Sequence, residues 1–272
     1  MELEERPAIL KESIKMPSLF LDRVVRVDFY LPTHVVQPSQ MNLLLINDGQ
    51  DLEALGWEAM IGQWGVQMRS KPLLSVGIHA GPERKMEYGT AHMADYKGRG
   101  AKARLYSRFV LEELIPHIRD NYQVPAFSEI AFAGFSLGGL SALDIAWNHP
   151  GVFSRVGVFS GSLWWRTKDK HDPTYDDYKD RIMHQHIRHS QHVPRLKFFF
   201  QCGGADEQAD RNNNGIIDSI DDTLDLMAEL EYRGFDSEED IHYLELEDGK
   251  HDIATWAKAM PAFLQWAWGS PA

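Results

Sequence analysis

The stretch Ile130–Gly139, IAFAGFSLGG, decides the fold. Its first part, Ile130–Ala133, is apolar and predicts a buried strand, and Leu137–Asn148 is expected to be a helix that stops before Pro150. Ser136 stands between two glycines at this strand-to-helix turn, which is typical of a nucleophile elbow, because the tight turn lifts the hydroxyl clear of the sheet. The bare pattern also arises by chance, so the strand–turn–helix context carries the prediction against the alternative of a glycine-rich loop that closes a strand.

Strands and helices alternate on both sides of this stretch. We expect strands at Arg23–Leu31, Met41–Ile46, Leu73–Ile78, Val156–Phe159, Leu196–Gln201 and Ile241–Leu246, and helices at Leu52–Trp64, Ala101–Tyr122, Leu224–Arg233 and Ile253–Trp268. Pro116 predicts a kink inside its helix, and the polar segment Lys168–His192 is expected to be a surface insertion. The alternation predicts an α/β fold with a mostly parallel sheet and helices on both faces. Because no linker or repeat divides the chain, residues 1–272 are expected to form a single domain.

Composition limits the classes of partner. The chain has 272 residues, 43% of them apolar, and a net charge of −12, which argues against nucleic acid and anionic membranes and leaves small-molecule substrates and metal cations. A single cysteine, Cys202, excludes an internal disulfide. The chain shows neither a signal peptide nor an apolar run of transmembrane length, so a cytoplasmic protein is expected, although a chain trimmed of its signal would look the same. No self-complementary surface can be recognised, so the oligomeric state stays open.

A nucleophilic serine needs a base for its proton, an acid that orients the base, and donors for the oxyanion. Ser136 is the candidate nucleophile, and His251 is the candidate base because it follows the last predicted strand on a glycine turn. His79 and His149 are the alternatives for the base.

The acid is expected after the strand that precedes the last one. Asp206 is favoured because small residues before it permit a close turn, and Glu207, with its longer reach, is the alternative acid. The backbone N–H of Leu137 follows the nucleophile directly and is one expected oxyanion donor. The N–H of Gln50, which follows the turn residues Asp48-Gly49, is the other, although an ordinary turn explains that segment nearly as well.

Six segments together resemble the "Putative esterase" family of α/β-hydrolases, which includes siderophore (enterobactin-type) esterases, feruloyl esterases, S-formylglutathione hydrolases and mycolyltransferases. The segments are Leu43–Gln50, Val76–Tyr88, Gly134–Gly139, Phe159–Trp165, Cys202–Glu207 and Gly249–Trp256. The resemblance implies an α/β-hydrolase fold, Ser136 as nucleophile, Asp206 or Glu207 as acid, His251 as base and Gln50 as an oxyanion donor. It is similar above all to the siderophore-esterase branch, through the segments around Arg84 and Trp164.

Three side chains are expected to contact the substrate. Trp164 and Trp165, just past a strand end, are candidates to line a pocket for an aromatic group, and core packing is an equally good explanation for one of them. Arg84 and Arg99, in the long loop after Ile78, are candidates to hold a carboxylate or phosphate, with surface solvation as the alternative. Of these two arginines, Arg84 is the one we assign to substrate binding.

A second motif, Asp210–Asp221, matches a 12-residue calcium loop, with oxygen side chains at every second position and a glycine at the bend. The expected ligands are Asp210, Asn212, Asn214, the carbonyl of Ile216, Asp218 and Asp221. The alternative is an Asx-rich surface turn with a helix cap. We expect calcium as a structural ion that orders the nearby acid-bearing turn, and no cofactor for catalysis.

Four histidines between His184 and His192 are interpreted as a solvated face, because no carboxylate stands at ligand spacing among them. The sequence therefore predicts a serine esterase that cleaves carboxylic esters through a Ser–His–Asp triad and an acyl-enzyme. The alternatives are an acyltransferase with the same triad and a calcium-binding protein on an inactive hydrolase scaffold. The identity of the ester is not encoded in any motif.

Overall fold

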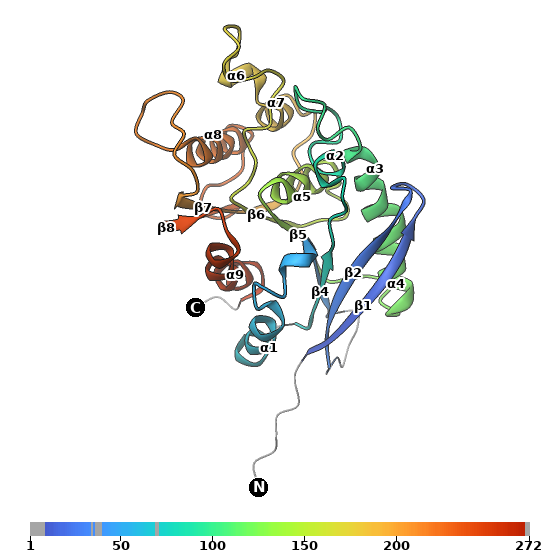
Figure 1. The fold of residues 1–272 in the computed structure, drawn as a ribbon. Coiled ribbons are helices and arrows are strands. Elements are labelled where there is room, and N and C mark those ends of the chain that lie inside the picture. Colours follow the sequence, from blue (N-terminus) through green and yellow to red (C-terminus); the bar gives the residue numbers. More distant parts are fainter. Residues whose placement is uncertain (1–8, 34, 36–39, 69–70, 270–272) are drawn as a thin grey trace.

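The computed structural model describes residues 9–33, 35, 40–68 and 71–269. Their centre is an eight-stranded sheet in the order β1-β2-β4-β3-β5-β6-β7-β8 (Figure 1). The strands are β1 Ile9–Ser18, β2 Arg23–Pro32, β3 Asn42–Asn47, β4 Leu73–Ile78, β5 Ile130–Phe135, β6 Arg155–Phe159, β7 Lys197–Ala205 and β8 Ile241–Lys250. Pairing is antiparallel from β1 through β2 to β4 and parallel across the rest of the sheet.

Helices cover both faces of this sheet and create a separate apolar core on each. Helices α1 (Trp57–Met68) and α9 (Ile253–Trp268) pack on one face (Figure 1). Helices α5 (Leu137–Asn148) and α8 (Asp218–Tyr232) pack on the other, together with α3 Ala103–Arg108, η3 Phe109–Leu114, α4 Ile115–Asn121 and α7 Ile182–Arg188. The remaining short elements are η2 Gly49–Asp51, α2 Arg84–Glu87 and α6 Asp177–Asp180. The prediction of a mostly parallel sheet covered on both faces is confirmed.

The central strands β3 and β5 show why the sequence folds in this way. Every residue of both strands is buried, as expected for parallel strands between two layers of helices. At the outer edge, β1 is buried only at its first and last residues and is otherwise half-buried or exposed; it was not predicted, because its apolar residues are few. In the described part of the chain, no helix is long and apolar enough to cross a membrane.

Two predicted helices differ from the observed ones. The helix predicted at Leu52–Trp64 begins only at Trp57, because Gly56 adopts a positive φ of 73° and the segment before it forms turns. The helix predicted at Ala101–Tyr122 is divided into α3, a π-helical turn (η3) and α4. Pro116 lies in the first turn of α4, directly after the π-helical stretch, and the backbone stays right-handed helical at the junction, so the helix is irregular before the proline but does not break.

The strands that lead to the predicted site residues are longer than predicted. The segment Cys202–Ala205, expected to be a turn, continues β7, and Gly249-Lys250 continues β8. A Cβ on Gly203 would lie 2.5 Å from the carbonyl carbon of Gly249, so glycine lets the two strands approach closely here. As a result Asp206 and His251 each stand immediately beyond the end of a strand.

Candidate active site

Ser136 occupies the strained turn that the sequence predicts between β5 and α5. Its backbone has φ 54° and ψ −122°, a conformation that non-glycine residues rarely adopt, and its side chain is half-buried. A Cβ on Gly134 would lie 2.3 Å from the carbonyl oxygen of Gly138, so the strand and helix approach too closely for any other residue at position 134. The turn presents the Ser136 hydroxyl at the carboxyl edge of the parallel sheet.

Asp206 and His251 reach the same edge from β7 and β8. The Asp206 Oδ2 accepts a hydrogen bond from the Gly203 N–H at 3.1 Å, which fixes the carboxylate against its own turn. Burial raises the pKa of Asp206, while the charge of His251 acts in the opposite direction. Burial likewise lowers the pKa of His251, opposed by Asp206 and reinforced by the Arg84 guanidinium. The acid and the imidazole therefore lie within electrostatic reach of each other.

Glu207, the neighbour of Asp206 in the chain, has different surroundings. The groups that influence its pKa, which burial raises, are Asp218, Asp222 and Lys170, and His251 is not among them. Asp206 Oδ1 is buried and has no hydrogen-bond partner among the described residues, so this oxygen is available to a histidine N–H. Of the two acids left open by the sequence, Asp206 is the one whose charge influences the pKa of His251.

Two serines at the end of β6 belong to the site and were not assigned a role from the sequence. The hydroxyl of Ser162 lies 3.4 Å from that of Ser136. Ser160 accepts a hydrogen bond of 3.0 Å from the Trp256 indole N–H. Its hydroxyl lowers the pKa of Asp206 and so opposes the effect of burial. The available signal was the Ser-Gly-Ser triplet at the end of the strand that neighbours β5.

The loop after β3 is tied to the elbow by a chain of hydrogen bonds. Asn47 donates to the Gly138 carbonyl at 2.8 Å and accepts from the Tyr106 hydroxyl at 2.5 Å. Gln50 bridges the loop, because its side chain donates to Asp48 at 3.0 Å and accepts from the Ala80 N–H at 3.0 Å. These contacts hold the backbone around Gln50 in a fixed position beside the start of α5.

Arg84 lies beside the site, but Asp48 already occupies its guanidinium. The two side chains form a bidentate ion pair with both N–O distances at 2.7 Å, and Asp48 is buried. Arg84 is 31% exposed and lowers the pKa of His251. Within the described chain its first role is therefore to hold the Asp48 turn and to add positive charge near the imidazole.

A protein-family comparison identifies the family. The family model described as "Putative esterase" matches residues 18–267. The chain belongs to this esterase family.

Several solved structures share the α/β-hydrolase fold of this chain. An enterobactin esterase from Shigella flexneri aligns with a TM-score of 0.71 at 20% identity, covering 95% of this chain and 58% of that one. A siderophore hydrolase from Aspergillus nidulans aligns with a TM-score of 0.67 at 14% identity over 97% of both chains. The uncharacterized protein YjcH of Bacillus subtilis is 23% identical over 232 residues, which are 84% of each chain. This chain spans little more than half the length of the enterobactin esterase from Shigella flexneri.

A cleft of about 260 Å³ opens beside the ends of β6 and β7 of this esterase. Its wall combines four cationic with two aromatic and two acidic side chains: Lys97, Arg99, Arg166, Lys170, Tyr96, Trp164, Glu207 and Asp218. Trp164 lies in this wall, with the Arg99 guanidinium 4.9 Å from its ring. Trp165 is fully buried in the core against Gly89 and Gly100, so of the two predicted pocket tryptophans Trp164 lines this cleft and Trp165 does not.

The predicted calcium loop of the esterase brings several of its oxygen side chains together. Asp221 contacts the side-chain amides of Asn212 at 2.6 Å and Asn214 at 3.1 Å, while Asp210 accepts hydrogen bonds from backbone N–H groups of the loop. Asp218 instead accepts from the Arg211 backbone N–H at 2.7 Å. It also forms ion pairs with the Arg211 and Lys170 side chains.

Helix α8 begins earlier than predicted in this region. It starts at Asp218 and not at Leu224, so the last two acidic positions of the loop lie in the first turn of a helix. Acidic residues are favoured there because the helix N-terminus carries partial positive charge, which the prediction from apolar periodicity did not take into account.

The interpretation of the four histidines as a solvated face is wrong for two of them. His184 is buried and its Nε2 lies 2.8 Å from the Asp222 carbonyl. His186 is half-buried and bonds Asn148 at 2.9 Å, whereas His189 is exposed. The segment 177–188 forms α6 and α7 and packs against α8, so its histidines face neighbouring helices as well as solvent.

Proposed function

We propose that the protein is a serine hydrolase that cleaves carboxylic esters with Ser136 as nucleophile, His251 as base and Asp206 as the acid that orients the base. The observation that carries this proposal is the placement of the three residues directly after β5, β8 and β7, at one edge of the parallel sheet, with Asp206 acting on His251. This chain order of serine, acid and histidine is the one that α/β-hydrolases use.

The proposed reaction proceeds in two steps. His251 takes the hydroxyl proton as Ser136 Oγ attacks the ester carbonyl, and it returns that proton to the departing alcohol, which leaves an acyl-enzyme. Water, deprotonated by the same imidazole, then attacks the acyl group and releases the acid, and Ser136 regains its proton. Asp206 stays ionised throughout and would accept the His251 Nδ1–H on Oδ1, which has no other hydrogen-bond partner among the described residues.

The oxyanion of the tetrahedral intermediate needs two donors. The Leu137 N–H belongs to the first turn of α5, where backbone N–H groups have no partner within the helix. The Gln50 N–H is the proposed second donor, supported by the side-chain bridge that fixes this loop. Both would act in a partly buried site, in which such donors stabilise charge more strongly than in water.

The cleft beside Trp164 supports a substrate with an aromatic and anionic portion. The net charge of the chain is −12, but the wall of this cleft contains four cationic side chains and only two acidic ones. Trp164 follows Ser162 by two residues, and the Ser162 hydroxyl lies 3.4 Å from that of Ser136. Two similar structures are an enterobactin esterase from Shigella flexneri in the presence of enterobactin and a ferulic acid esterase. We propose a hydroxylated or carboxylated aromatic ester for this chain.

A matched ester series tests the function. Catecholate, feruloyl and unsubstituted benzoyl esters of one alcohol are compared with p-nitrophenyl acetate, in the wild type and in Ser136→Ala. The proposal expects the hydroxylated aromatic esters, catecholate and feruloyl, to have the highest kcat/KM and Ser136→Ala to be inactive on all of the esters. Activity that persists in Ser136→Ala contradicts the triad, whereas a preference for acetate contradicts only the substrate class. Products formed with competing alcohols reveal any transfer to an acceptor other than water.

We also propose that the loop Asp210–Asp221 binds calcium as a structural ion. The proposed ligands are Asp210, Asn212, Asn214, the Ile216 carbonyl and Asp221, supported by the contacts that already gather the two amides at Asp221. Asp218, which pairs with Arg211 and Lys170, occupies the position at which such loops often bind through water. A bound ion would order the segment that follows Asp206.

Calcium binding is tested by calorimetric titration of the chelator-treated protein. We expect one ion to bind, the melting temperature to rise, and Asp210→Asn to weaken the binding. If calcium changes neither the heat signal nor the melting temperature, the loop is an Asx-rich turn only. This result would leave the esterase proposal untouched.

A further inference from the structure

Three side chains with metal-binding atoms meet on the face of the sheet covered by α5. They come from distant segments: His92 from the loop after α2, Asp144 from α5 and His186 from α7. One ligand atom from each lies within 4.8 Å of the other two. None of the three is part of the proposed triad or of the predicted calcium loop.

Asp144 is buried among apolar neighbours of α5, where an isolated carboxylate is costly. Its Oδ2 accepts a hydrogen bond of 2.8 Å from the Ala91 N–H, and its Oδ1 accepts from the Asn148 amide at 3.2 Å. Within the described ranges, no lysine or arginine comes within 4.0 Å of this carboxylate, and the nearest cationic candidate is His92 Nδ1 at 4.0 Å. No full positive charge therefore faces this group, and burial raises the pKa of Asp144 to about 7.

The two imidazoles face each other beside this carboxylate. Their rings are stacked with centroids 4.3 Å apart and planes at 21°. Burial lowers the pKa of His92, and burial together with the neighbouring His92 and His192 lowers that of His186 to about 4. The neutral imidazole is the form that coordinates metal ions.

We propose that His92, Asp144 and His186 bind a divalent ion of the zinc class. Two imidazoles and one carboxylate, with water in the remaining position, are a donor set that Zn²⁺ uses when three protein groups hold it. The ion would supply the counter-charge that Asp144 lacks. It would also join the loop that carries His92 to α5 and α7.

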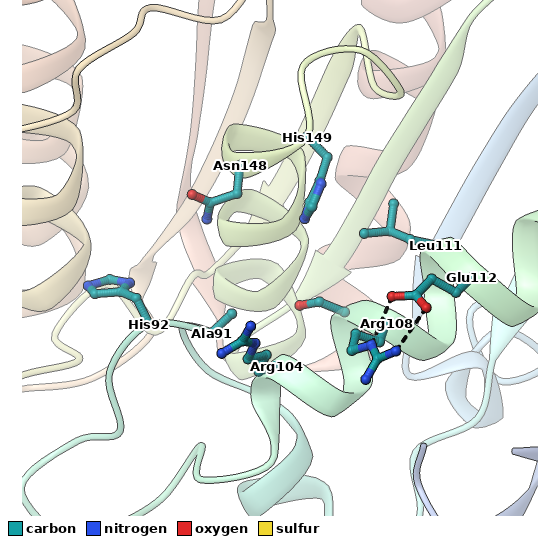
Figure 2. A pocket seen from close by; sticks show the side chains of 9 residues that line it. Ala91, His92, Arg104, Arg108, Leu111, Glu112, Asn148 and His149 are labelled. Carbon is teal, nitrogen blue, oxygen red and sulfur yellow. Dashed lines mark hydrogen bonds and ion pairs between the residues drawn. The ribbon is translucent and has the colours of Figure 1, made fainter. Parts of the chain in front are cut away.

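Access for the water ligand comes from a neighbouring cleft of about 420 Å³. His92 and Asn148 stand at one side of this cleft, with His149 and Arg104 close by (Figure 2). A water molecule or a small anion can therefore reach the ion from solvent. This opening makes the proposed site more exposed than a closed structural zinc site.

Binding requires a small closure of the three side chains. Ligand atoms at Zn²⁺ distances lie roughly 3.3 Å apart in a tetrahedron, which is shorter than the present separation limit. Asn148 is placed to guide this closure, because it bonds His186 at 2.9 Å and also donates to the Asp144 carboxylate. Partners of this kind orient the ligands of metal sites. The His92 ring is part of a loop and partly exposed, so it has room to move.

The test is a calorimetric titration of the full-length protein with Zn²⁺ alone, after removal of metals by a chelator. The proposal expects one zinc-binding event in the wild type that is weakened at least about tenfold in His92→Ala and in His186→Ala. Co²⁺ is the spectroscopic probe, and it should give the visible absorption bands of a low-coordinate ion in the wild type. These bands should be lost in both variants.

His189→Ala is the matched control, because His189 is an exposed histidine next to the same helix. It should bind Zn²⁺ as the wild type does, and far-ultraviolet circular dichroism verifies that every variant is folded. Zinc binding that survives in both His92→Ala and His186→Ala overturns the proposal. So does binding that is lost in His189→Ala, or a wild type that binds no zinc.

Discussion

The two ends of α5 carry chemistry of two different kinds. At the first end, Ser136 lies in a strained turn, and the residues that form this turn are consecutive in the sequence. Eight residues later, about 12 Å along the helix, Asp144 meets two histidines from segments far away in the chain. The first site is visible as a short motif, and the second exists only because the fold brings three segments together. A site defined by a local backbone turn can be predicted from the sequence, whereas a cluster of side chains from distant segments can be recognised only once their packing in the fold is known.

Removal of the nucleophile is expected to have the largest effect. Ser136→Ala should lower kcat/KM for esters by about 10⁴-fold or more, because no acyl-enzyme can form. Zinc affinity at the other end of α5 should stay within about twofold of the wild type. The initial rate and the calorimetric titration of one preparation check both statements, and a loss of zinc binding in this variant would show that the two sites are not independent.

The acid of the triad gives the next largest effect. Asp206→Asn should lower kcat by about 10³-fold, since the amide no longer holds His251 in the required tautomer. Glu207→Gln, next to it in the chain, should leave kcat within about threefold and change mainly KM, because Glu207 lines the cleft. Steady-state kinetics distinguish the two carboxylates, and equal losses of kcat would contradict the assignment of Asp206.

The geometry of the elbow predicts an effect on stability. Gly134→Ala would place a Cβ 2.3 Å from the Gly138 carbonyl oxygen, and we expect a loss of about 3 kcal/mol in the free energy of unfolding. Gly151→Ala is the control, because its Cβ would meet no atom within 4 Å. Urea titrations measure both changes. If Gly134→Ala leaves the free energy of unfolding unchanged, the strand and helix are not as closely packed as described.

The pH dependence is expected to shift when Arg84 is neutralised. Because burial lowers the pKa of His251, the base is neutral down to pH values below its ordinary range, and kcat/KM should rise through that lowered pKa and be flat above about pH 7. Arg84→Gln removes a positive charge that also lowers this pKa and leaves Asp48 unpaired, so the rising limb should move to higher pH by less than about one unit. A shift to lower pH would contradict this electrostatic account.

The smallest effect is expected at the far end of α5. His186→Ala should leave kcat/KM for esters within about twofold, because Asp144 and its histidines stand apart from the sheet edge that holds Ser136. Ester hydrolysis with and without added Zn²⁺ measures this. A tenfold loss would show that the histidine cluster supports catalysis through α5.

Much of the fold could be predicted from local patterns. The bounds of α5 and α9 agree with the prediction, because glycines or caps and apolar periodicity mark them. Strand β1 escaped prediction because an exposed edge strand has few apolar residues. The start of α8 escaped because its first turn is acidic and its apolar positions come later.

The site could be predicted only in part. Ser136, Asp206 and His251 could be predicted to lie at one sheet edge because each follows a strand, but the choice between Asp206 and Glu207 depends on the direction of two side chains. The histidine cluster was missed since no local spacing connects His186 to Asp144. One signal was present, namely a single acid, Asp144, within an otherwise apolar and buried helix.

The most direct test of the central claim is labelling of the native protein with a fluorophosphonate, followed by mass spectrometry of the modified peptide. The account predicts one adduct, on Ser136, which forms faster as pH rises through the pKa of His251 and does not form in His251→Ala. Ser162 is the serious competitor, since its hydroxyl lies 3.4 Å away. An adduct on Ser162, or a protein that remains unlabelled, would contradict the account.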